Sequence, residues 1–308
     1  MMYTLLIIFQ ILIIPKLDCN PPICEAKWSL QPSGTSQVLL GLSFTSQKKG
    51  YAVGTEGTIR VTEDAGKTWI SQVSGTSDFL RDVHFSDALT GTIVGQSGLI
   101  LRTTDGGQNW IRQNSGTTEH LVHVHFYNNK VGMASGQGGI ILKTNDGGLT
   151  WIKQTTHTLV EIPGVYMISE NVAVAVGFNG LILRTDDGGS TWKVKSSSIV
   201  NDLRSVSFSG NSGVAVGIGG KILYSNDAGQ TWTVASNSIE VDLYAVQFLK
   251  TNQVFTVGTG QILVSADLGK TWSSSSSPAF GEDLYAVAFN SGMGWAAGQN
   301  GLLFTYNP

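Results

Sequence analysis

The sequence is poor in cysteine, proline and charge, and each shortage excludes a class of protein. Only two cysteines and seven prolines occur among 308 residues. Two cysteines cannot build the disulfide framework or the cysteine-rich zinc site that supports many small folds. Charged residues make up 13% of the chain and the net charge is −3, whereas a nucleic-acid-binding surface needs a high density of Lys and Arg. We therefore expect no nucleic-acid partner.

Long hydrophobic runs are also missing. The one apolar segment, residues 5–14, has ten residues and ends at Pro15 and Lys16, which is too short for the roughly 20 residues of a membrane-spanning helix. Its length suits a secretory signal, although no Lys or Arg precedes it and no Ala-x-Ala site follows. We predict that residues 1–24 are a cleaved signal peptide, with an uncleaved anchor as the alternative. Cys19 and Cys24 follow the run and either pair with each other or are partly lost with the signal.

Catalytic and cofactor motifs are absent as well. The sequence contains no nucleophile elbow, no paired-histidine metal motif and no phosphate-binding loop, and each of these is needed to position a reactive group or a bound ion. The recurring Gly-x-x-Gly segments are too regular to indicate nucleotide binding. We expect a protein that is not an enzyme and that uses neither a metal nor a cofactor.

What the chain does contain is glycine, 38 residues of it, and an octet that recurs. Residues 103–110 read Thr-Thr-Asp-Gly-Gly-Gln-Asn-Trp, and near-copies lie at 62–69, 144–151, 185–192, 225–232 and 265–272. Their aspartates are spaced by 41, 41, 41, 40 and 40 residues. Such a period indicates one supersecondary unit copied around an architecture.

The chemistry of the octet predicts a β-hairpin turn. Asp and Ser/Thr side chains can bond to nearby backbone groups, the fixed glycine supplies positive φ, and the tryptophan covers the turn. The octet matches the Asp-box of bacterial-neuraminidase-type repeats, in which the box resembles a structural brace. We therefore predict structural rather than catalytic roles for its six aspartates: Asp64, Asp105, Asp146, Asp187, Asp227 and Asp267.

Each repeat predicts four short strands. In residues 80–113 an alternating strand around Val83 and Phe85 is followed by residues 91–95, a Gly-x-x-Gly turn, the segment that leads into the box, and the segment after Trp110. Four strands in about forty residues, with no helical period, are typical of a β-propeller blade.

The two ends of the chain predict a closed ring. The C-terminus stops where a further box begins, around Thr305, and Trp28 lies 41 residues before Trp69. The N-terminal strand would then complete the last blade and leave no open sheet edge. We predict an all-β, seven-bladed propeller of four-stranded antiparallel blades over residues 25–308, and we expect a monomer. An open β-solenoid is the alternative architecture.

Acidic residues recur before the inner strands, on the face opposite the boxes. They would surround the channel mouth beside Arg81, His123 and Arg204. Two interpretations remain open: the carboxylates cap backbone N–H groups or pair with the nearby arginines, or they form a binding ring for a cation or a sugar. The acids are Asp78, Glu119, Glu161, Asp202, Asp242 and Asp283.

Basic residues gather in blades two to four. Blades five to seven have Tyr224, Val264 and Phe304 where the earlier blades have a cation before the box. This sector is either an ordinary solvated face or a patch that docks an acidic or C-terminal-carboxylate partner, for which Arg offers bidentate geometry. The candidate partner-binding residues are Arg102, Arg112, Lys143, Lys153, Arg184 and Lys193.

The combined pattern of Leu-x-x-Val-x-Phe strands, Gly-x-x-Gly turns and boxes resembles the photosystem II stability and assembly factor family of seven-bladed propellers, over residues 25–308. The resemblance implies an exported or lumenal assembly factor that binds a membrane-protein precursor through an arginine-rich patch. Arg102, Lys143 and Arg184 are the nearest match to that patch. A thylakoid-lumen location would apply only in a photosynthetic host, and no plastid transit peptide is present.

Two other functions compete with this interpretation. A secreted lectin would bind glycans between blades, but it predicts equivalent site residues in most blades. A sialidase-like glycoside hydrolase would need three convergent arginines with a Tyr/Glu pair, or two opposed carboxylates. Only Arg81 and Arg204 are arginines at equivalent inner-strand positions.

Overall fold

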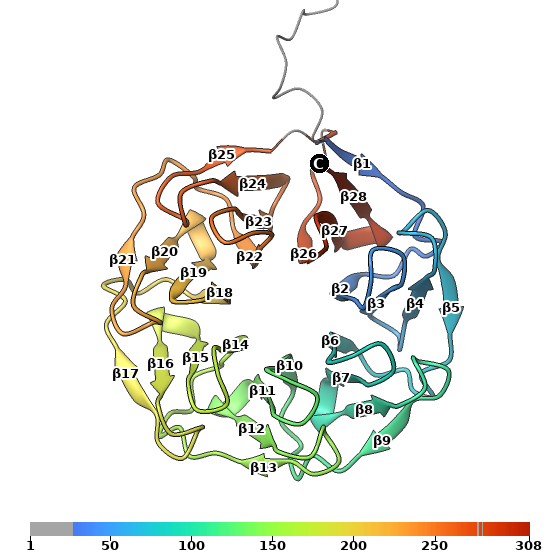
Figure 1. Ribbon diagram of the computed structural model, residues 1–308, viewed down its shortest axis with the longest axis horizontal. Helices are drawn as coiled ribbons and strands as arrows, with labels where there is room; N and C mark the ends of the chain where they lie inside the picture. Colours follow the sequence, from blue (N-terminus) through green and yellow to red (C-terminus); the bar gives the residue numbers. More distant parts are fainter. Residues whose placement is uncertain (1–26, 276, 279) are drawn as a thin grey trace, which may run out of the picture.

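The chain folds into a closed ring of seven four-stranded antiparallel sheets, seen down the ring axis in Figure 1. The computed structural model describes residues 27–275, 277–278 and 280–308. The predicted signal segment, with Cys19 and Cys24, lies outside the described residues. Within the described part, no helix is long and apolar enough to cross a membrane.

The strands follow the chain from the channel outward in each blade. Blade 1 is β2 (Leu39–Phe44), β3 (Gly50–Gly54), β4 (Ile59–Thr62) and β5 (Ile70–Gln72); blade 2 is β6 (Leu80–Phe85), β7 (Gly91–Gly95), β8 (Ile100–Thr103) and β9 (Ile111–Gln113). Blade 3 is β10 (Leu121–Phe126), β11 (Gly132–Gly136), β12 (Ile141–Thr144) and β13 (Ile152–Lys153); blade 4 is β14 (Gly164–Met167), β15 (Ala173–Val176), β16 (Ile182–Thr185) and β17 (Lys193–Lys195).

The last three blades keep this order, and the seventh takes its outer strand from the other end of the chain. Blade 5 is β18 (Leu203–Ser209), β19 (Ser212–Gly217), β20 (Ile222–Ser225) and β21 (Thr233–Val234); blade 6 is β22 (Leu243–Phe248), β23 (Val254–Gly258), β24 (Gln261–Ser265) and β25 (Ser273–Ser274). Blade 7 is β26 (Leu284–Asn290), β27 (Met293–Gly298), β28 (Leu303–Asn307) and β1 (Lys27–Leu30).

The predicted ring closure is confirmed. Strand β1 lies beside β28 (Figure 1) and pairs with it antiparallel, so that Trp28 is opposite Tyr306. The Trp28 side chain is 2% exposed, and its indole nitrogen donates to Ser275 Oγ of blade 6 at 3.2 Å. One indole therefore joins the N-terminal strand, the C-terminal strand and the preceding blade.

The core is divided among the gaps between blades rather than gathered on the axis. Each gap holds a cluster of buried apolar side chains drawn from both neighbouring blades. In the gap between blades 2 and 3, for example, Val94 and Ile100 pack with Leu142 and Trp151. Burial of this kind provides the main driving force for folding, and it leaves the axis free for an open channel.

Turns alternate between the two faces because the strands are antiparallel. The first-to-second-strand turns and the boxes share one face, as shown by the amide of Gly106 in a box donating to the carbonyl of Leu89. The Gly-x-x-Gly turns lie on the other face as single 3₁₀ turns, with the links between blades. They are η1 (Gln96–Gly98), η2 (Gln137–Gly139), η3 (Phe178–Gly180), η4 (Ile218–Gly220) and η5 (Gln299–Gly301).

One expected register is wrong. In blade 2, Gly91 pairs with Thr103 and Thr92 pairs with Arg102, whereas in blade 7 the corresponding pairs are Gly294 with Tyr306 and Trp295 with Thr305. Tyr306 therefore takes the place of the box threonine, and Thr305, not Phe304, takes the place of Arg102. Sequence alone misplaced these residues by one because adjacent repeats differ in length by one residue.

Candidate functional site

The six box aspartates form hydrogen bonds within their own turns. In the box of blade 3, Asp146 Oδ1 accepts hydrogen bonds from Thr144 Oγ1 at 2.8 Å and from the Thr150 amide at 2.9 Å. Asp146 Oδ2 accepts from Thr150 Oγ1 at 2.5 Å. The carboxylate thus ties the start of the turn to its end. The other boxes repeat this pattern through Asp64, Asp105, Asp187, Asp227 and Asp267.

The one departure from the octet pattern keeps the same bond. Asn109 replaces threonine, and its Nδ2 donates to Asp105 Oδ2 at 2.8 Å. This hydrogen bond is the main cause that lowers the pKa of Asp105 from 3.8 to about 2. A carboxylate held this firmly in its charged form serves as a brace rather than as a proton donor.

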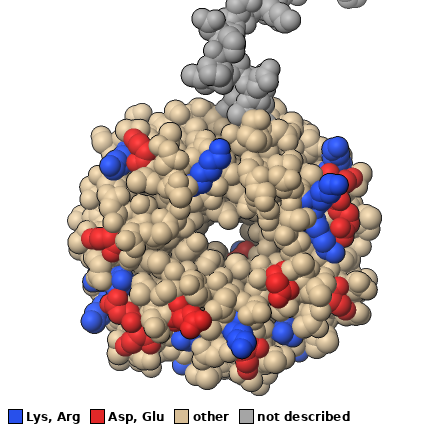
Figure 2. Space-filling model, viewed as in Figure 1, with Lys and Arg blue, Asp and Glu red and all other residues tan. Residues whose placement is uncertain are grey.

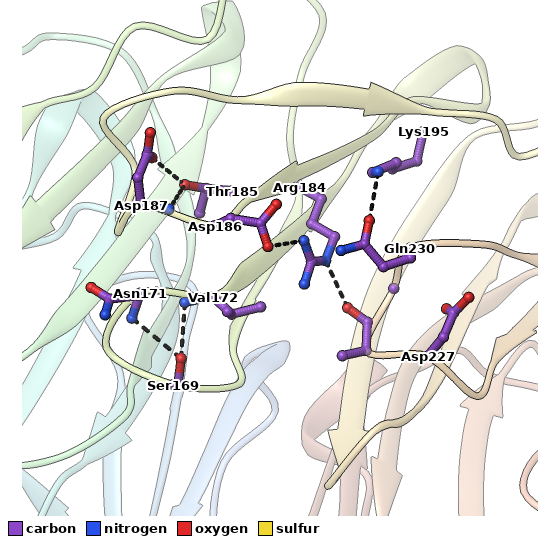
Figure 3. A network of polar contacts seen from close by, with 12 residues as sticks. Ser169, Asn171, Val172, Arg184, Thr185, Asp186, Asp187, Lys195, Asp227 and Gln230 are labelled. Carbon is purple, nitrogen blue, oxygen red and sulfur yellow. Dashed lines mark hydrogen bonds and ion pairs between the residues drawn. The ribbon is translucent and has the colours of Figure 1, made fainter.

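The predicted basic sector divides into two groups that point to different places. The cations that precede the boxes reach across to the next blade and donate to a carbonyl of its box. Arg102 Nε bonds Gly147 O at 2.6 Å, and Lys143 Nζ bonds Gly188 O at 2.8 Å. Arg184 Nε bonds Ala228 O at 2.8 Å and also pairs with Asp186 (Figure 3). These three residues therefore clasp neighbouring blades together.

Blades 1 and 7 lack this cation but still donate a side-chain hydrogen bond to the box of the next blade, which the sequence analysis did not predict. Tyr51 Oη donates to Gly106 O at 2.5 Å, and Trp295 Nε1 donates to Ala65 O at 2.9 Å. Tyr51 is paired across the strands with Val61, and Trp295 is paired with Thr305. In blades 1 and 7 the donor thus lies one strand further inward than the cation of blades 2 to 4, and no sequence repeat predicts this exchange.

The remaining basic residues lie on the outermost strands. Arg112, Lys153 and Lys193 are exposed, and Arg112 comes within 3.9 Å of Asp78. Large apolar side chains are exposed next to them on the same strands: Ile111, Ile152 and Val194 are 64%, 60% and 72% exposed. Figure 2 shows Lys, Arg, Asp and Glu in small groups around the rim of the face in view, with no continuous basic patch. The six candidates therefore do not converge on one point.

The acidic residues do not form a single ring. In each blade, the amide after the glycine that ends the second strand donates to a carbonyl of the link that precedes the first strand. The residue with this carbonyl marks an equivalent position in the repeats. In blades 2 to 7 it is Phe79, His120, Glu161, Asp202, Asp242 and Asp283. Asp78 and Glu119 precede this position by one residue. The six acids therefore occupy two different positions in the repeat.

Three of these acids accept hydrogen bonds from neighbouring residues of the ring. Asp202 Oδ1 accepts from the Asn179 amide at 3.0 Å, and Asp242 Oδ1 accepts from the Gly219 amide at 2.9 Å. Asp283 Oδ1 accepts from Thr259 Oγ1 at 2.6 Å. In blade 3 the ring of His120 takes this role, with its Nδ1 accepting from the Ser97 amide at 2.8 Å. Asp202 and Asp242 thus bond backbone N–H groups, whereas Asp283 bonds a side-chain hydroxyl.

A cavity of about 360 Å³ occupies the channel between the inner strands, and Figure 2 shows the opening on the axis. Arg81, His123 and Arg204 line it as expected, together with Glu161, whereas Asp78, Glu119, Asp202, Asp242 and Asp283 do not. Side chains that the sequence did not single out complete the lining, among them Asp82, His84, His125, Tyr244 and Tyr285.

Several of these inner-strand groups link neighbouring blades. Asp82 Oδ2 accepts from the Val124 amide at 2.9 Å and lies 3.7 Å from His123 Nε2, and His125 Nδ1 accepts from the Met167 amide at 3.2 Å. Burial raises the pKa of Asp82 and lowers that of His84 to about 4. No cluster of three or more His, Cys, Asp or Glu residues able to hold a metal ion occurs among the described residues.

Comparison with solved structures finds the same fold in several proteins. The structure described as "YCF48 bound to D1 peptide" has a TM-score of 0.74 and 24% identity, covering 96% of this chain and 97% of that one. YCF48 from Cyanidioschyzon merolae has a TM-score of 0.76 and 22% identity, covering 91% and 99%. The WD40 β-propeller domain of Doa1 has a TM-score of 0.75 at 14% identity, covering 91% and 97%. At these identities the likeness establishes the fold alone.

Sequence comparison is more specific. No curated protein matches the chain. The family described as "Photosynthesis system II assembly factor YCF48" matches residues 21–112, 70–167 and 154–241, which together span well over half of the sequence. The chain therefore belongs to the YCF48 family of photosystem II assembly factors.

Proposed function

We propose that this propeller is a non-enzymatic assembly factor that binds a segment of a membrane-protein precursor. The observation that carries the proposal is the family match together with a complete seven-bladed ring. The similar structure described as bound to a D1 peptide supports a protein ligand. Precursor binding also suits an exported protein, with residues 1–24 as its signal and the thylakoid lumen as its compartment in a photosynthetic host.

The binding surface that we propose is the outer rim of blades 2 to 4. Its exposed cations Arg112, Lys153 and Lys193 alternate with exposed apolar residues. An extended acidic and apolar segment could pair with both kinds of side chain, because the cations steer its approach and the apolar groups contribute burial. The clasp residues Arg102, Lys143 and Arg184 would act indirectly, by holding the blades that carry this rim.

A charge-matched comparison tests this surface. The triple variant Arg112→Glu/Lys153→Glu/Lys193→Glu is titrated with D1-derived peptides beside Lys67→Glu/Lys250→Glu/Lys270→Glu, which changes the same charge at exposed lysines outside blades 2 to 4. We expect binding to weaken at least about tenfold in the first variant only. Equal binding by both variants would remove the rim from the proposal, and no binding by the wild type would remove the peptide ligand.

The two alternatives are separated by direct assays. A lectin would bind on a glycan array, and a glycoside hydrolase would turn over a fluorogenic glycoside and lose that activity when Glu161 is changed to Gln. We expect neither signal, because the lining of the channel differs from blade to blade and includes arginines only from blades 2 and 5.

A further inference from the structure

Among the residues that the structure describes, three buried nitrogen atoms at the channel have no hydrogen-bond partner. They are Arg81 Nε, Arg204 Nε and His123 Nδ1, and all three residues line the same cavity. More than about 90% of buried polar groups in proteins have a partner. The guanidinium nitrogen can only donate, so whatever satisfies the two arginines must present acceptor oxygens.

The two arginines are not required by the repeat. Their equivalents in the other blades are Leu40, Val122, Pro163, Tyr244 and Tyr285. All except Pro163 are, like the two arginines, the second residue of the inner strand, and Pro163 directly precedes β14. Five blades thus close without a cation at this level. An arginine that the repeat does not require, whose Nε is buried without a partner beside a cavity, points to a ligand.

The guanidinium of Arg204 is held by an aromatic ring and by a carboxylate that lies beyond hydrogen-bond distance. Its guanidinium carbon lies 4.4 Å from the centre of the Phe178 ring, and Arg204 Nη2 is 3.9 Å from Asp202 Oδ2. Asp202 already accepts the Asn179 amide. Arg81 has no ion pair within the described residues. Both side chains therefore retain donors for a further partner.

Two carboxylates face the same cavity and must be weighed. Asp82 is occupied by the Val124 amide and lies beside His123, and its raised pKa shows that burial disfavours its charge. Glu161 remains as the other acid of the lining. One of the two carboxylates is thus already engaged, whereas the lining contributes two arginines.

We propose that the channel binds a small dicarboxylate, with one carboxylate on the Arg81 guanidinium and the other on that of Arg204. The planar fork of Arg matches a carboxylate with two parallel hydrogen bonds. The volume of about 360 Å³ is within the range of small-molecule sites. The phenol rings of Tyr244 and Tyr285, whose centres are 5.0 Å apart, form another part of the wall. This site is separate from the rim and needs no protein partner.

Calorimetric titration of the isolated protein tests the proposal. Succinate and glutarate are compared with butyrate, which has one carboxylate, and with succinamide, which has none. We expect at least one dicarboxylate to bind with a dissociation constant below about 1 mM, butyrate to bind at least about tenfold more weakly, and succinamide not to bind. Binding of inorganic phosphate more tightly than either dicarboxylate would contradict the assignment, as would the absence of binding by both dicarboxylates.

Variants locate the site and separate it from the proposed function. Arg81→Gln and Arg204→Gln should each weaken dicarboxylate binding about tenfold or more, whereas Arg112→Gln, on the exposed rim, should leave it unchanged. Arg81→Lys, which keeps the charge but loses the fork, should give an intermediate loss and guards against misfolding. The rim triple variant should bind succinate normally. Unchanged binding in Arg81→Gln and Arg204→Gln would overturn the proposal whatever the peptide assays show.

Discussion

The Asp-box turns and the inner strands come from the same repeat, yet the two regions differ in how far they vary. Each box has the same bonds from Ser or Thr to Asp and from Asp to the end of the turn, even where Asn109 replaces threonine. At the channel, the inner-strand position of Arg81 holds leucine, valine, proline, arginine or tyrosine in the other blades. Uniform positions hold the fold, and variable positions are where this chain can carry a function of its own.

The largest expected effect concerns ring closure, which rests on a repeated tryptophan. Trp28→Ala should lower the free energy of unfolding by about 4 kcal/mol, because a fully buried aromatic leaves a cavity at the junction of blades 6 and 7. Leu30→Ala is the matched control on the same strand, since Leu30 is 57% exposed, and it should change stability little. Urea denaturation followed by fluorescence measures both, and equal losses would contradict a special role for Trp28.

The next effect is a loss of stability in acid that arises in the channel. His84 has a pKa of about 4 in the folded protein because burial disfavours its charge, against 6.5 in the unfolded chain. Between these values the unfolded chain takes up a proton that the folded protein does not, so stability falls as the pH drops from about 6.5 towards 4. His125, whose pKa is also lowered, acts in the same direction.

His84→Gln isolates this contribution. Between pH 6.5 and pH 4.5 the variant should lose about 2 kcal/mol less stability than the wild type. Asp82, whose pKa is raised, acts in the opposite direction but is present in both proteins. Urea denaturation at each pH gives the comparison, and parallel pH profiles would show that His84 makes no such contribution.

A smaller effect is expected at a single box. Asp146→Ala should cost about 1 kcal/mol, because the carboxylate ties together a turn that water partly reaches. Asn145→Ala changes the neighbouring exposed residue of the same turn and should cost nothing measurable. If Asn145→Ala were the more harmful change, the brace would not depend on the aspartate.

The smallest effect is the most informative about function. Arg81→Gln should change the free energy of unfolding by less than about 0.5 kcal/mol, because Arg81 Nε has no partner to lose. A stability loss comparable to that of Trp28→Ala would mean that the channel arginine is a structural element. If Arg81→Gln leaves the free energy of unfolding nearly unchanged but abolishes dicarboxylate binding, this one variant separates a channel position that serves binding from the box positions that serve stability.

The sequence by itself determined the architecture. The period of 40 or 41 residues, the box chemistry and the position of Trp28 in that series were enough for seven blades and for closure by the N-terminal strand, because these features depend on local turn geometry and on counting. Arg81, His123 and Arg204, which the sequence analysis put beside the channel mouth, line the channel cavity.

Only the tertiary structure determined which polar side chains are already used in bonds between blades and which remain free to bind a ligand. Arg102 and Arg184 look like surface cations in the sequence, but each donates to a box in the next blade. Tyr51 performs the same task from another strand, and Asp202 is occupied as a cap. These bonds join residues of different blades, and their partners depend on how the blades pack around the ring. A repeat fixes the strands of each blade, but it does not fix which neighbouring blade satisfies a given donor.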